Sequence, residues 1–463
     1  MPKKKTALTI EERLQQALVP AEEQPYEVPE NWVWVRLGSL AQDMADGPFG
    51  SNLKTEHYTN NKEVRIIQLS NIGENGWRED NKKYTTFEHA KVIARSKVEA
   101  GDIVIAKMMP AGRAIICPSY EQQYVLSSDA VKFVPNSLVD NNFCCKGINS
   151  HFFQTLVQEN TQGITRARTS IKKLKGYPFP LPPLSEQQRI VERIEELFAK
   201  LDEAKERLQE VADSFAVRKA AILHKAFTGE LTKQWRRENG VSDESWEEKK
   251  LGEVGFWLGG GTPSTSREEY WENGNILWIT SKDMKSAVIE DTLMKVNEIG
   301  VKNSSANYIE KPALLVVMRS GILRRTFPVS MVKKPFTVNQ DLKAIIPDKD
   351  DLEFLYWMLL SNEQRILDTC MKNGTTVESI NSNALKDLTF KCPTLPEQHE
   401  IVRLIDDLLA RERSAQQAAE QALASIDLMK KSILARAFRG ELGTNKASEA
   451  SALELLKQVL AEN

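Results

Sequence analysis

The stretch from Ser185 to Leu231 reads SEQQRIVERIEELFAKLDEAKERLQEVADSFAVRKAAILHKAFTGEL, and the chain contains a second copy of it. The second copy, from Pro396 to Leu442, reads PEQHEIVRLIDDLLARERSAQQAAEQALASIDLMKKSILARAFRGEL. One offset of 211 residues relates Glu186 to Glu397 and also relates the two closing Gly-Glu-Leu tripeptides. A duplication of this size predicts two similar modules related by pseudo-symmetry.

In both copies, apolar residues recur at alternating steps of three and four, the heptad pattern of a helix that packs against another helix. We expect two long helices without interior breaks, each roughly 60 Å long, that pack antiparallel against each other. The alternative is that each helix is a core element of its own domain, but the narrow seam favours a contact between two helices. The predicted seam consists of Ile190, Ile194, Leu197, Leu201, Leu208, Phe215 and Ile222 in the first copy and Ile401, Ile405, Leu408, Ile426, Met429 and Ile433 in the second.

The ends of these helices carry their own signals. Ser185 with Gln188 three residues later predicts a capping box at the start of the first helix. Gly229 and Gly440 stand just past the two helices, where a left-handed residue would end each of them. A further short amphipathic helix with its own capping box is expected over residues 9–18.

The chain before each long helix is also duplicated. The first module opens at Trp32 and the second at Trp246, and each alternates short apolar strands with turns before a helix around 143–158 or 352–368 and a glycine loop. The predicted fold class is α+β, with two mixed α/β domains separated by two long antiparallel coiled-coil helices and an internal pseudo-two-fold repeat. The predicted segments are an N-terminal helix and connector (1–31), module 1 (32–184), the first long helix (185–231), a linker (232–245), module 2 (246–395), the second long helix (396–442), and a C-terminal linker and helix (443–463).

Composition describes an ordinary folded protein, with 41% hydrophobic and 27% charged residues among 463. No apolar run reaches the ~18 residues of a membrane span. The five cysteines show no CxxC spacing, so a structural zinc site is not expected. The same cysteine usage predicts a reducing compartment, and we expect a cytoplasmic location. The net charge of −2 does not indicate nucleic-acid binding, but a local basic face matters more than the sum.

Motifs for catalysis are missing from the sequence. It contains no Walker loop, no HExxH, no GxSxG and no Asn/Asp-Pro-Pro-aromatic tetrapeptide of the adenine methyltransferases. The run Gly259–Gly261 lacks the spacing of a phosphate-binding loop. We therefore expect a chain that binds and leaves the chemistry to partners.

The duplicated motifs resemble those of the specificity subunit of type I restriction–modification systems. They are Pro182-Pro183-Leu184-Ser-Glu186-Gln187 and Leu395-Pro-Glu397-Gln398, the closing Ala226-Phe227-Thr-Gly229-Glu230-Leu231 and Ala437-Phe438-Arg-Gly440-Glu441-Leu442, and the loops Asp46-Gly-Pro48-Phe-Gly50-Ser51 and Gly260-Gly261-Thr262-Pro263-Ser264. One departure is Thr394, which stands where the first copy has Pro183.

This resemblance implies two target-recognition domains, each reading half of a bipartite, asymmetric site in double-stranded DNA. It implies two methyltransferase subunits and two restriction/translocase subunits as partners, and no membrane. S-adenosylmethionine, ATP and Mg are then expected on the partner subunits, with no catalytic residue, metal or cofactor on this chain.

The residues expected to face DNA are polar and basic side chains in the loops of the two modules. The alternative for each of them is a solvated surface group, and Gly163 and Gly374 in the glycine loops could serve only as turn residues. The candidates are Ser51, Asn52, Lys54, Lys107, Arg113, Arg166 and Arg168 in module 1, and Thr262, Ser264, Ser266, Arg267, Lys282, Arg319, Arg324 and Arg325 in module 2.

Two other classes of function are alternatives to this one. A coiled-coil adaptor that binds only protein would not need two loop-rich modules. A fused enzyme with its own methyltransferase activity is opposed by the missing tetrapeptide motif, and binding of S-adenosylmethionine by the isolated chain would support it.

Overall fold

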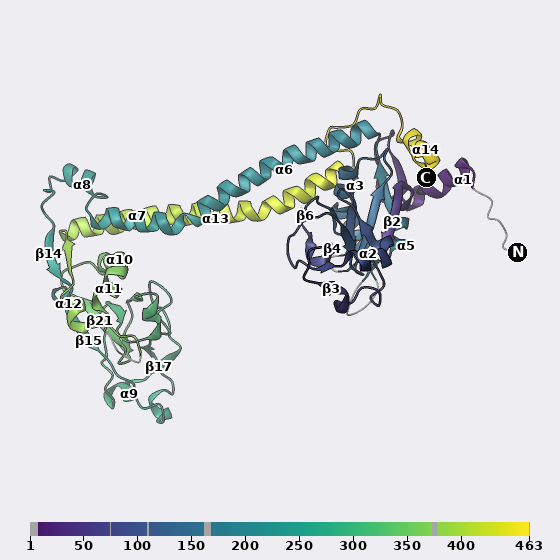
Figure 1. Ribbon diagram of the computed structural model, residues 1–463. Coiled ribbons are helices and arrows are strands. Elements are labelled where there is room, and N and C mark those ends of the chain that lie inside the picture. Colours follow the sequence, from purple (N-terminus) through teal and green to yellow (C-terminus); the bar gives the residue numbers. More distant parts are fainter. Residues whose placement is uncertain (1–7, 75, 109–110, 162–167, 373–376, 463) are drawn as a thin grey trace. The chain divides into compact units, whose positions relative to one another are not determined.

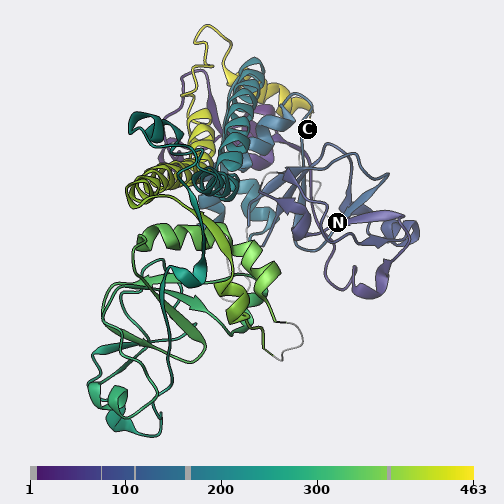
Figure 2. The ribbon, with the colours of Figure 1, turned by 90° about the vertical axis from the view of Figure 1, so that its left-hand side faces the viewer.

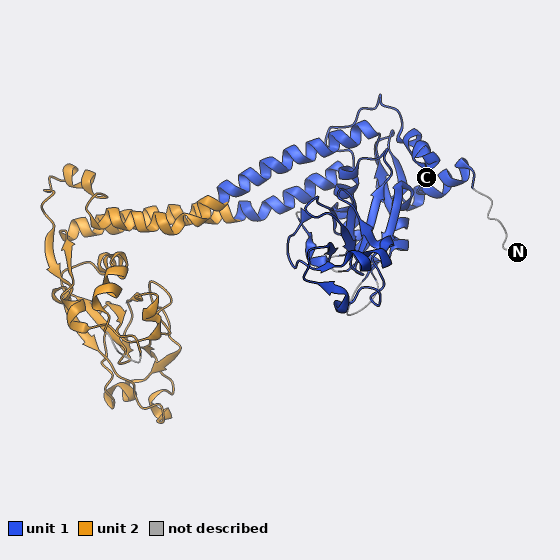
Figure 3. Cartoon of the chain, in the orientation of Figure 1, with its two compact units in different colours: residues 1–208, 421–463 blue, residues 209–420 orange. Residues whose placement is uncertain are grey.

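The computed structural model describes residues 8–74, 76–108, 111–161, 168–372 and 377–462. The chain forms two compact units, one of residues 1–208 with 421–463 and the other of residues 209–420 (Figure 3). Each unit contains one module and part of each long helix (Figure 1). Among the described residues, no helix is both long enough and apolar enough to cross a membrane.

The described residues of module 1 form four sheets, one of them the two-stranded hairpin β5–β6, with flanking helices. β1 (Val33–Arg36) pairs antiparallel with β13 (Pro178–Leu181). A four-stranded antiparallel sheet has the order β10 (Ala114–Ile116), β9 (Ile103–Ala106), β12 (Ala130–Pro135) and β2 (Ala41–Asp46). A five-stranded sheet has the order β3 (Tyr58–Thr59), β7 (Tyr84–Thr85), β4 (Val64–Ile67), β11 (Tyr124–Leu126) and β8 (Lys97–Val98). The remaining strands and α-helices of the module are the hairpin β5 (Ile72–Gly73) and β6 (Gly76–Trp77), α2 (Phe87–Val92), α3 (Asn141–Ile148), α4 (His151–Glu159) and α5 (Ile171–Gly176), and α1 (Ile10–Ala17) precedes the module.

Module 2 repeats this plan. β14 (Glu247–Lys250) pairs antiparallel with β22 (Thr389–Cys392). A four-stranded antiparallel sheet has the order β15 (Gly255–Gly259), β21 (Leu342–Pro347), β18 (Ala313–Val317) and β19 (Val329–Val332), and a three-stranded sheet has the order β17 (Met294–Val296), β16 (Ile276–Ile279) and β20 (Phe336–Val338). The helices are α8 (Lys233–Glu238) before the module, then α9 (Glu298–Lys302), α10 (Leu352–Ser361), α11 (Glu363–Cys370) and α12 (Ser382–Lys386).

The two modules have matching topologies. In each, a two-stranded ribbon joins the first and last strands, and a four-stranded antiparallel sheet forms the centre. A further sheet in each contains one parallel pair, β4 with β11 and β16 with β20. The predicted fold class, with two mixed helix-and-strand modules, long helices and an internal repeat, is confirmed.

One expectation for the modules is wrong in detail, because each closing helix is two helices. α3 and α4 are separated at Asn149 and Ser150, where Ser150 accepts the backbone N–H of Phe153 and caps α4. α10 and α11 are separated at Asn362. The side chains of Ser and Asn compete for backbone hydrogen bonds, which favours a helix boundary at these positions.

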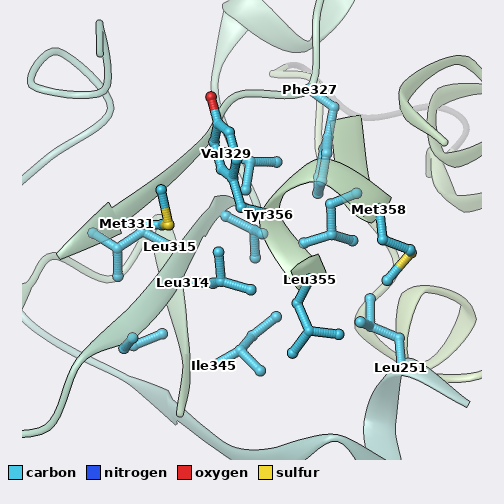
Figure 4. Packing of buried hydrophobic residues seen from close by; sticks show 14 of the residues in the cluster. Leu251, Leu314, Leu315, Phe327, Val329, Met331, Ile345, Leu355, Tyr356 and Met358 are labelled. Atoms are coloured by element: carbon cyan, nitrogen blue, oxygen red, sulfur yellow. The ribbon is translucent and has the colours of Figure 1, made fainter. Parts of the chain in front are cut away.

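The core of module 2 lies between its four-stranded sheet and α10. Figure 4 shows Leu314 and Ile345 of the sheet gathered against Leu355 of α10. All three are fully buried. In module 1, the ring of Phe179 packs against α3 at Gly147, where a Cβ would lie 2.4 Å from that ring. Glycine therefore stands inside a helix because a neighbouring ring needs the space.

The long helices are α6 (Leu184–Asp213), α7 (Phe215–Phe227) and α13 (Leu395–Ala437). The second copy is continuous over 43 residues, as predicted. The first is interrupted at Ser214, whose hydroxyl donates to the carbonyls of Glu210 and Val211. The expectation of an unbroken first helix is therefore wrong at this one residue, although the backbone bond from Arg218 N to Ser214 O continues across it.

The predicted capping box at Ser185 is not present. α6 begins one residue earlier, at Leu184, and the carbonyl of Pro183 accepts the backbone N–H groups of Glu186 and Gln187. Ser185 is therefore the second residue of the helix and does not occupy the capping position. The glycine predictions are confirmed, since Gly229 and Gly440 have φ of 79° and 75°.

The long helices run antiparallel within each unit, and they lie side by side in both views (Figure 1, Figure 2). In the unit of module 1, Ile190 shares a core with Ala437, whereas Asp202 further along α6 accepts from Lys430 at 2.5 Å. Residue numbers thus rise on one helix as they fall on the other. In the unit of module 2, Leu223 shares a core with Ile401, Val402 and Ile405, and Arg218 of α7 forms an ion pair with Glu412.

Burial along the seam differs between its ends and its middle. Ile190, Ile194, Ile401 and Ile405 are fully buried and belong to the module cores, so at these ends the helices are core elements of their own modules. Ile426 is also buried, at 3% exposed. The other seam residues of the first copy are half-buried, namely Leu197, Leu201, Leu208, Phe215 and Ile222. In the second copy, Leu408 and Ile433 are half-buried as well.

Met429 does not lie in the seam. It is 49% exposed, whereas the side chain of the next residue, Lys430, is only 18% exposed and takes the inward position. The Lys430 ammonium lies 5.1 Å from the ring centroid of Phe198, while the same group bonds to Asp202. An α-helix drifts relative to a strict heptad. Four residues after Ile426 the helix therefore faces its partner at Lys430, whereas three residues after Ile426 it faces away at Met429.

Candidate nucleic-acid interface

A buried glutamate fixes the start of each long helix to its surroundings. Glu186 accepts Trp32 Nε1 at 2.8 Å and Asn445 Nδ2 at 2.9 Å. Its repeat counterpart, Glu397, accepts Arg236 Nη1 and Thr232 Oγ1, both at 2.7 Å. In both units the donors include residues that follow a Gly-Glu-Leu tripeptide, so the duplicated tripeptide and the duplicated glutamate are parts of one joint.

The glutamine after each glutamate positions the module itself. Gln187 accepts the backbone N–H of Asp140 at 2.8 Å, and Gln398 accepts that of Asp351 at 2.8 Å. Each of these aspartates is the N-cap of the first helix of its pair, α3 or α10. The repeated Glu-Gln motif is therefore architectural, since it fixes each module to its long helix.

Polar side chains in module 1 gather at the edge of the four-stranded sheet where β2 and β9 end and β12 begins. Lys107 Nζ lies 2.8 Å from Asp46 Oδ1, and Arg168 Nη2 lies 2.5 Å from Asp129 Oδ1. Lys107 is only 15% exposed, whereas Arg168 is 48% exposed. The structure thus brings together two predicted residues, Lys107 and Arg168. We call these four residues the salt-bridge edge of module 1.

Module 2 also has two ion pairs at the edge where β15 and β18 end and β21 begins. Arg319 Nε lies 2.8 Å from Asp341 Oδ1, and Arg319 is 56% exposed. Arg324 forms an ion pair with Glu378, and this hydrogen bond lowers the pKa of the Glu378 carboxyl. Thr262 joins the same edge through Gln340, which precedes Asp341. We call Arg319, Arg324, Asp341 and Glu378 the salt-bridge edge of module 2.

The two salt-bridge edges are built on one backbone scheme. The N–H of Lys107 donates to Asp129 O at 2.8 Å, and that of Met318 donates to Asp341 O at 2.8 Å. An isolated antiparallel bridge then pairs Met108 with Arg168 in module 1 and Arg319 with Ser379 in module 2. The offset of 211 residues relates Met108 to Arg319 and Arg168 to Ser379.

The arginine therefore comes from opposite sides of the same bridge in the two modules. In module 1 it is the second partner of the bridge, and in module 2 it is the first. In both cases it pairs with the aspartate that directly precedes β12 in module 1 or β21 in module 2. Sequence reasoning missed these acidic partners, although an aspartate stands before the strand in both copies.

The glycine-containing loop at each edge is explained by close packing. A Cβ at Gly47 would lie 1.8 Å from the carbonyl oxygen of Ser127, and one at Gly260 would lie 1.8 Å from that of Val338. No side chain fits at either position. Glycine at these positions lets the backbone pass close to Ser127 in module 1 and to Val338 in module 2.

Three predicted residues of module 1 lie in a separate loop after β2. Ser51, Asn52 and Lys54 are exposed. The stacked rings of His57 and His89, with centroids 4.0 Å apart, both bond to this loop. His89 Nε2 bonds to Asn52 O at 2.8 Å, and the N–H of Lys54 donates to His57 Nδ1 at 3.0 Å.

The other candidates are scattered over their modules. Arg113 follows β9 and faces Glu74 at 3.9 Å. In module 2, Ser264 and Ser266 bond to each other at 2.8 Å, and Arg267 donates to Tyr270 OH. Lys282 and Arg325 are exposed on turns. Arg166, with Gly163 and Gly374, lies outside the described residues.

Among the residues that the structure describes, no group of three or more His, Cys, Asp or Glu side chains could hold a metal ion. All five cysteines are free and buried, and burial raises the pKa of Cys145 to about 12. Burial keeps this thiol protonated at neutral pH.

The comparisons with known proteins agree with this architecture. Residues 29–213 and 243–422 match the family described as type I restriction modification DNA specificity domain. The EcoR124I/EcoR124II specificity subunit of Escherichia coli is 32% identical over 288 residues, which cover 60% of this chain and 66% of that protein. The EcoKI specificity subunit of Escherichia coli K12 is 24% identical over 470 residues, covering 94% of this chain and 96% of that protein.

Two solved structures share the fold. The HsdS subunit from Thermoanaerobacter tengcongensis has a TM-score of 0.65 at 19% identity and covers 91% of this chain and 100% of that one. A second structure is described as the structural basis underlying complex assembly and conformational transition of the type I R-M system. It has a TM-score of 0.60 at 19% identity and covers 90% of this chain and 100% of that one.

The family match covers well over half of the chain in two separate regions, each containing a module and part of a long helix. The chain therefore belongs to the type I restriction modification DNA specificity family. It is a specificity subunit that carries the specificity domain twice, and its role is recognition of DNA sequence. Catalysis by type I restriction enzymes does not belong to this subunit.

Proposed function

We propose that modules 1 and 2 are two target-recognition domains that each read one half of a bipartite, asymmetric DNA site. The observation that carries this proposal is the repeated salt-bridge edge. Both modules place an exposed arginine on the same backbone bridge, but the surrounding loops differ. Two similar scaffolds with different polar loops suit two different half-sites.

In this proposal the chain directs partner subunits. Two methyltransferase subunits bind it and methylate adenines, and restriction/translocase subunits complete the complex in the cytoplasm. S-adenosylmethionine, ATP and Mg are held by those partners. The names of the relatives, which are specificity subunits of type I restriction enzymes, support this assignment.

Recognition of each half-site has to coexist with methylation. A methyltransferase acts on a base that is rotated out of the duplex, so the duplex must be deformed near each half-site. The long helices would hold the two modules at a set separation, as half-site spacing on a duplex follows the geometry of the protein that reads it.

Methylation-sensitive sequencing tests this proposal. The complete system is expressed in cells without other methyltransferases, and methylated adenines are mapped across the genome. We expect one motif with two defined parts and a fixed spacer of unspecified bases. A contiguous motif, or no methylation that depends on this chain, would contradict the proposal, and the second result would favour the protein-binding adaptor.

A further inference from the structure

The salt-bridge edges differ from ordinary phosphate-binding surfaces. In module 1 the cations Lys107 and Arg168 are matched by Asp46 and Asp129, so the edge has almost no net charge. Phosphate contacts draw their free energy from neutralised charge and released counterions, and a neutral edge offers little of either. Lys107 is also mostly covered. This edge is therefore poorly suited to binding the DNA backbone.

The same pairing suits an arginine that reads a base. Contact with a carboxylate holds a long, flexible side chain in one orientation, and the guanidinium has five N–H donors in a fixed fork. In module 2 the aspartate bonds to Nε of Arg319, so both terminal nitrogens remain available. In module 1 the aspartate bonds to Nη2 of Arg168, which leaves Nη1 and the second N–H of Nη2 available. Arg168 and Arg319 are 48% and 56% exposed, which leaves half of each side chain open to a ligand.

The duplication supplies an independent argument. Drift would remove a surface ion pair of no consequence, because such pairs contribute little to stability. Here the pair exists in both modules although the arginine comes from opposite partners of the bridge. What the modules share is the location of an aspartate-bound guanidinium, and only the residue that supplies it differs.

We propose that Arg168 and Arg319 are specificity-determining residues, each oriented by an aspartate to donate two hydrogen bonds to a guanine in the half-site of its module. This inference rests on the proposed function. The O6 and N7 atoms of guanine in the major groove form the acceptor pair that fits an arginine fork. Asp129 and Asp341 are positioning residues, because they act through the arginines.

The test replaces the fork but keeps the charge. Complexes carrying Arg168→Lys or Arg319→Lys are expressed as complete systems, and their methylated motifs are mapped by sequencing. Lysine can keep the ion pair with the aspartate but has no planar fork. We expect discrimination at one guanine position to fall about 10-fold to 100-fold in a single half-site, with the other half-site and the spacer unchanged.

A structural role predicts a different result. If the arginines only stabilise the edge or contact phosphate, the lysine variants keep the original motif, and any loss of methylation is uniform over all sites. Either observation would overturn the inference. The matched control is Arg207→Lys, an arginine on α6 that is 76% exposed, and it should leave the motif unchanged.

A second variant tests the equivalence of the two edges directly. Met108→Arg combined with Arg168→Ser moves the arginine of module 1 to the side of the bridge that module 2 uses. The guanine preference should survive in this double variant but be lost in Arg168→Ser alone. Equal motifs from these two variants would contradict the inference. If the unmodified system yields no two-part motif, the proposed function fails, whatever the variants show.

Discussion

Arg236 and Glu397 are both buried, and Arg236 Nη1 donates to Glu397 Oε1 at 2.7 Å where module 2 joins its long helix. The arginine also reaches Gly229 O at 2.8 Å and Asp243 Oδ1 at 3.0 Å. One side chain thus connects the end of α7, the linker and the start of α13. In the other unit, Glu186 occupies the same position with neutral donors instead.

Arg236→Met should destabilise the unit of residues 209–420 by about 3–5 kcal/mol, because it leaves Glu397 buried without its cation. Urea unfolding followed by tryptophan fluorescence would measure this change. Arg193→Met is the matched control, since the Arg193–Glu196 pair is exposed on α6 and should contribute less than about 1 kcal/mol. Equal effects of the two substitutions would contradict this account of the joint.

Acidification should loosen the C-terminal segment of the other unit. Arg189 forms two hydrogen bonds with Glu449, at 2.9 and 2.8 Å, and these hold the pKa of Glu449 below its ordinary value of 4.5. A depressed carboxyl pKa gives stability that is present above 4.5 and lost as the pH falls through the lower folded-state value. Hydrogen exchange of residues 443–462 at several pH values would measure this loss.

Glu449→Gln provides the control for that experiment. It removes the titrating group, so protection of the segment, relative to the intrinsic exchange rate at each pH, should be lower at neutral pH and should no longer fall in this acidic window. If the unmodified chain and this variant respond identically to pH, the Arg189–Glu449 pair does not hold the segment in place.

The two close-packed glycines allow a sharp stability test. Gly47→Ala and Gly260→Ala should each cost more than about 2 kcal/mol, since the added Cβ would overlap a backbone carbonyl. Gly50→Ala is the control three residues later, where a Cβ meets nothing within 4 Å. Thermal unfolding of the three variants would separate them. A Gly47 variant as stable as the Gly50 variant would show that these backbones are not so closely packed.

The helices should act as a ruler for the spacer between half-sites. The pairing of Asp202 with Lys430 sets the register, so insertions of seven residues after Leu208 and after Leu423 stand opposite each other. They preserve the heptad and add about 10.5 Å, or roughly three base pairs at about 3.4 Å each. Motif mapping should show the same half-sites with a longer spacer. A folded variant that still methylates the original spacing would show that the helices do not set it.

Much of the fold could be predicted because each pattern occurs twice, so one copy supports the interpretation of the other. The heptad steps, the closing glycines and the equal offset identified two long helices and two modules. The interruption at Ser214 and the outward position of Met429 could not be predicted, since each depends on local hydrogen bonding and on the partner helix. Periodicity gives the face of a helix but not where its drift moves one residue outward.

The candidate interface was less accessible to sequence reasoning. Basic residues can be selected by type, but their value depends on acidic partners that fold next to them from distant segments. Arg168 and Asp129 are 39 positions apart, and Arg319 and Asp341 are 22 apart. Only the folded edge shows that Arg168 and Arg319 hold equivalent places, while Ser51 and Lys54 belong to another loop.

The central claim is that the two modules read DNA independently. The most direct measurement is motif mapping after residues 246–381 are replaced by the equivalent module of a relative with a different target. The structure supports this exchange, because module 2 has its own core and the bond from Thr232 to Glu397 lies outside the exchanged residues. Gln398 accepts a backbone N–H at position 351, which the incoming module also supplies. We predict that one half-site changes to that of the relative, while the other half-site and the spacer stay the same. A change in both half-sites, or in neither, from a folded and active complex would contradict the account.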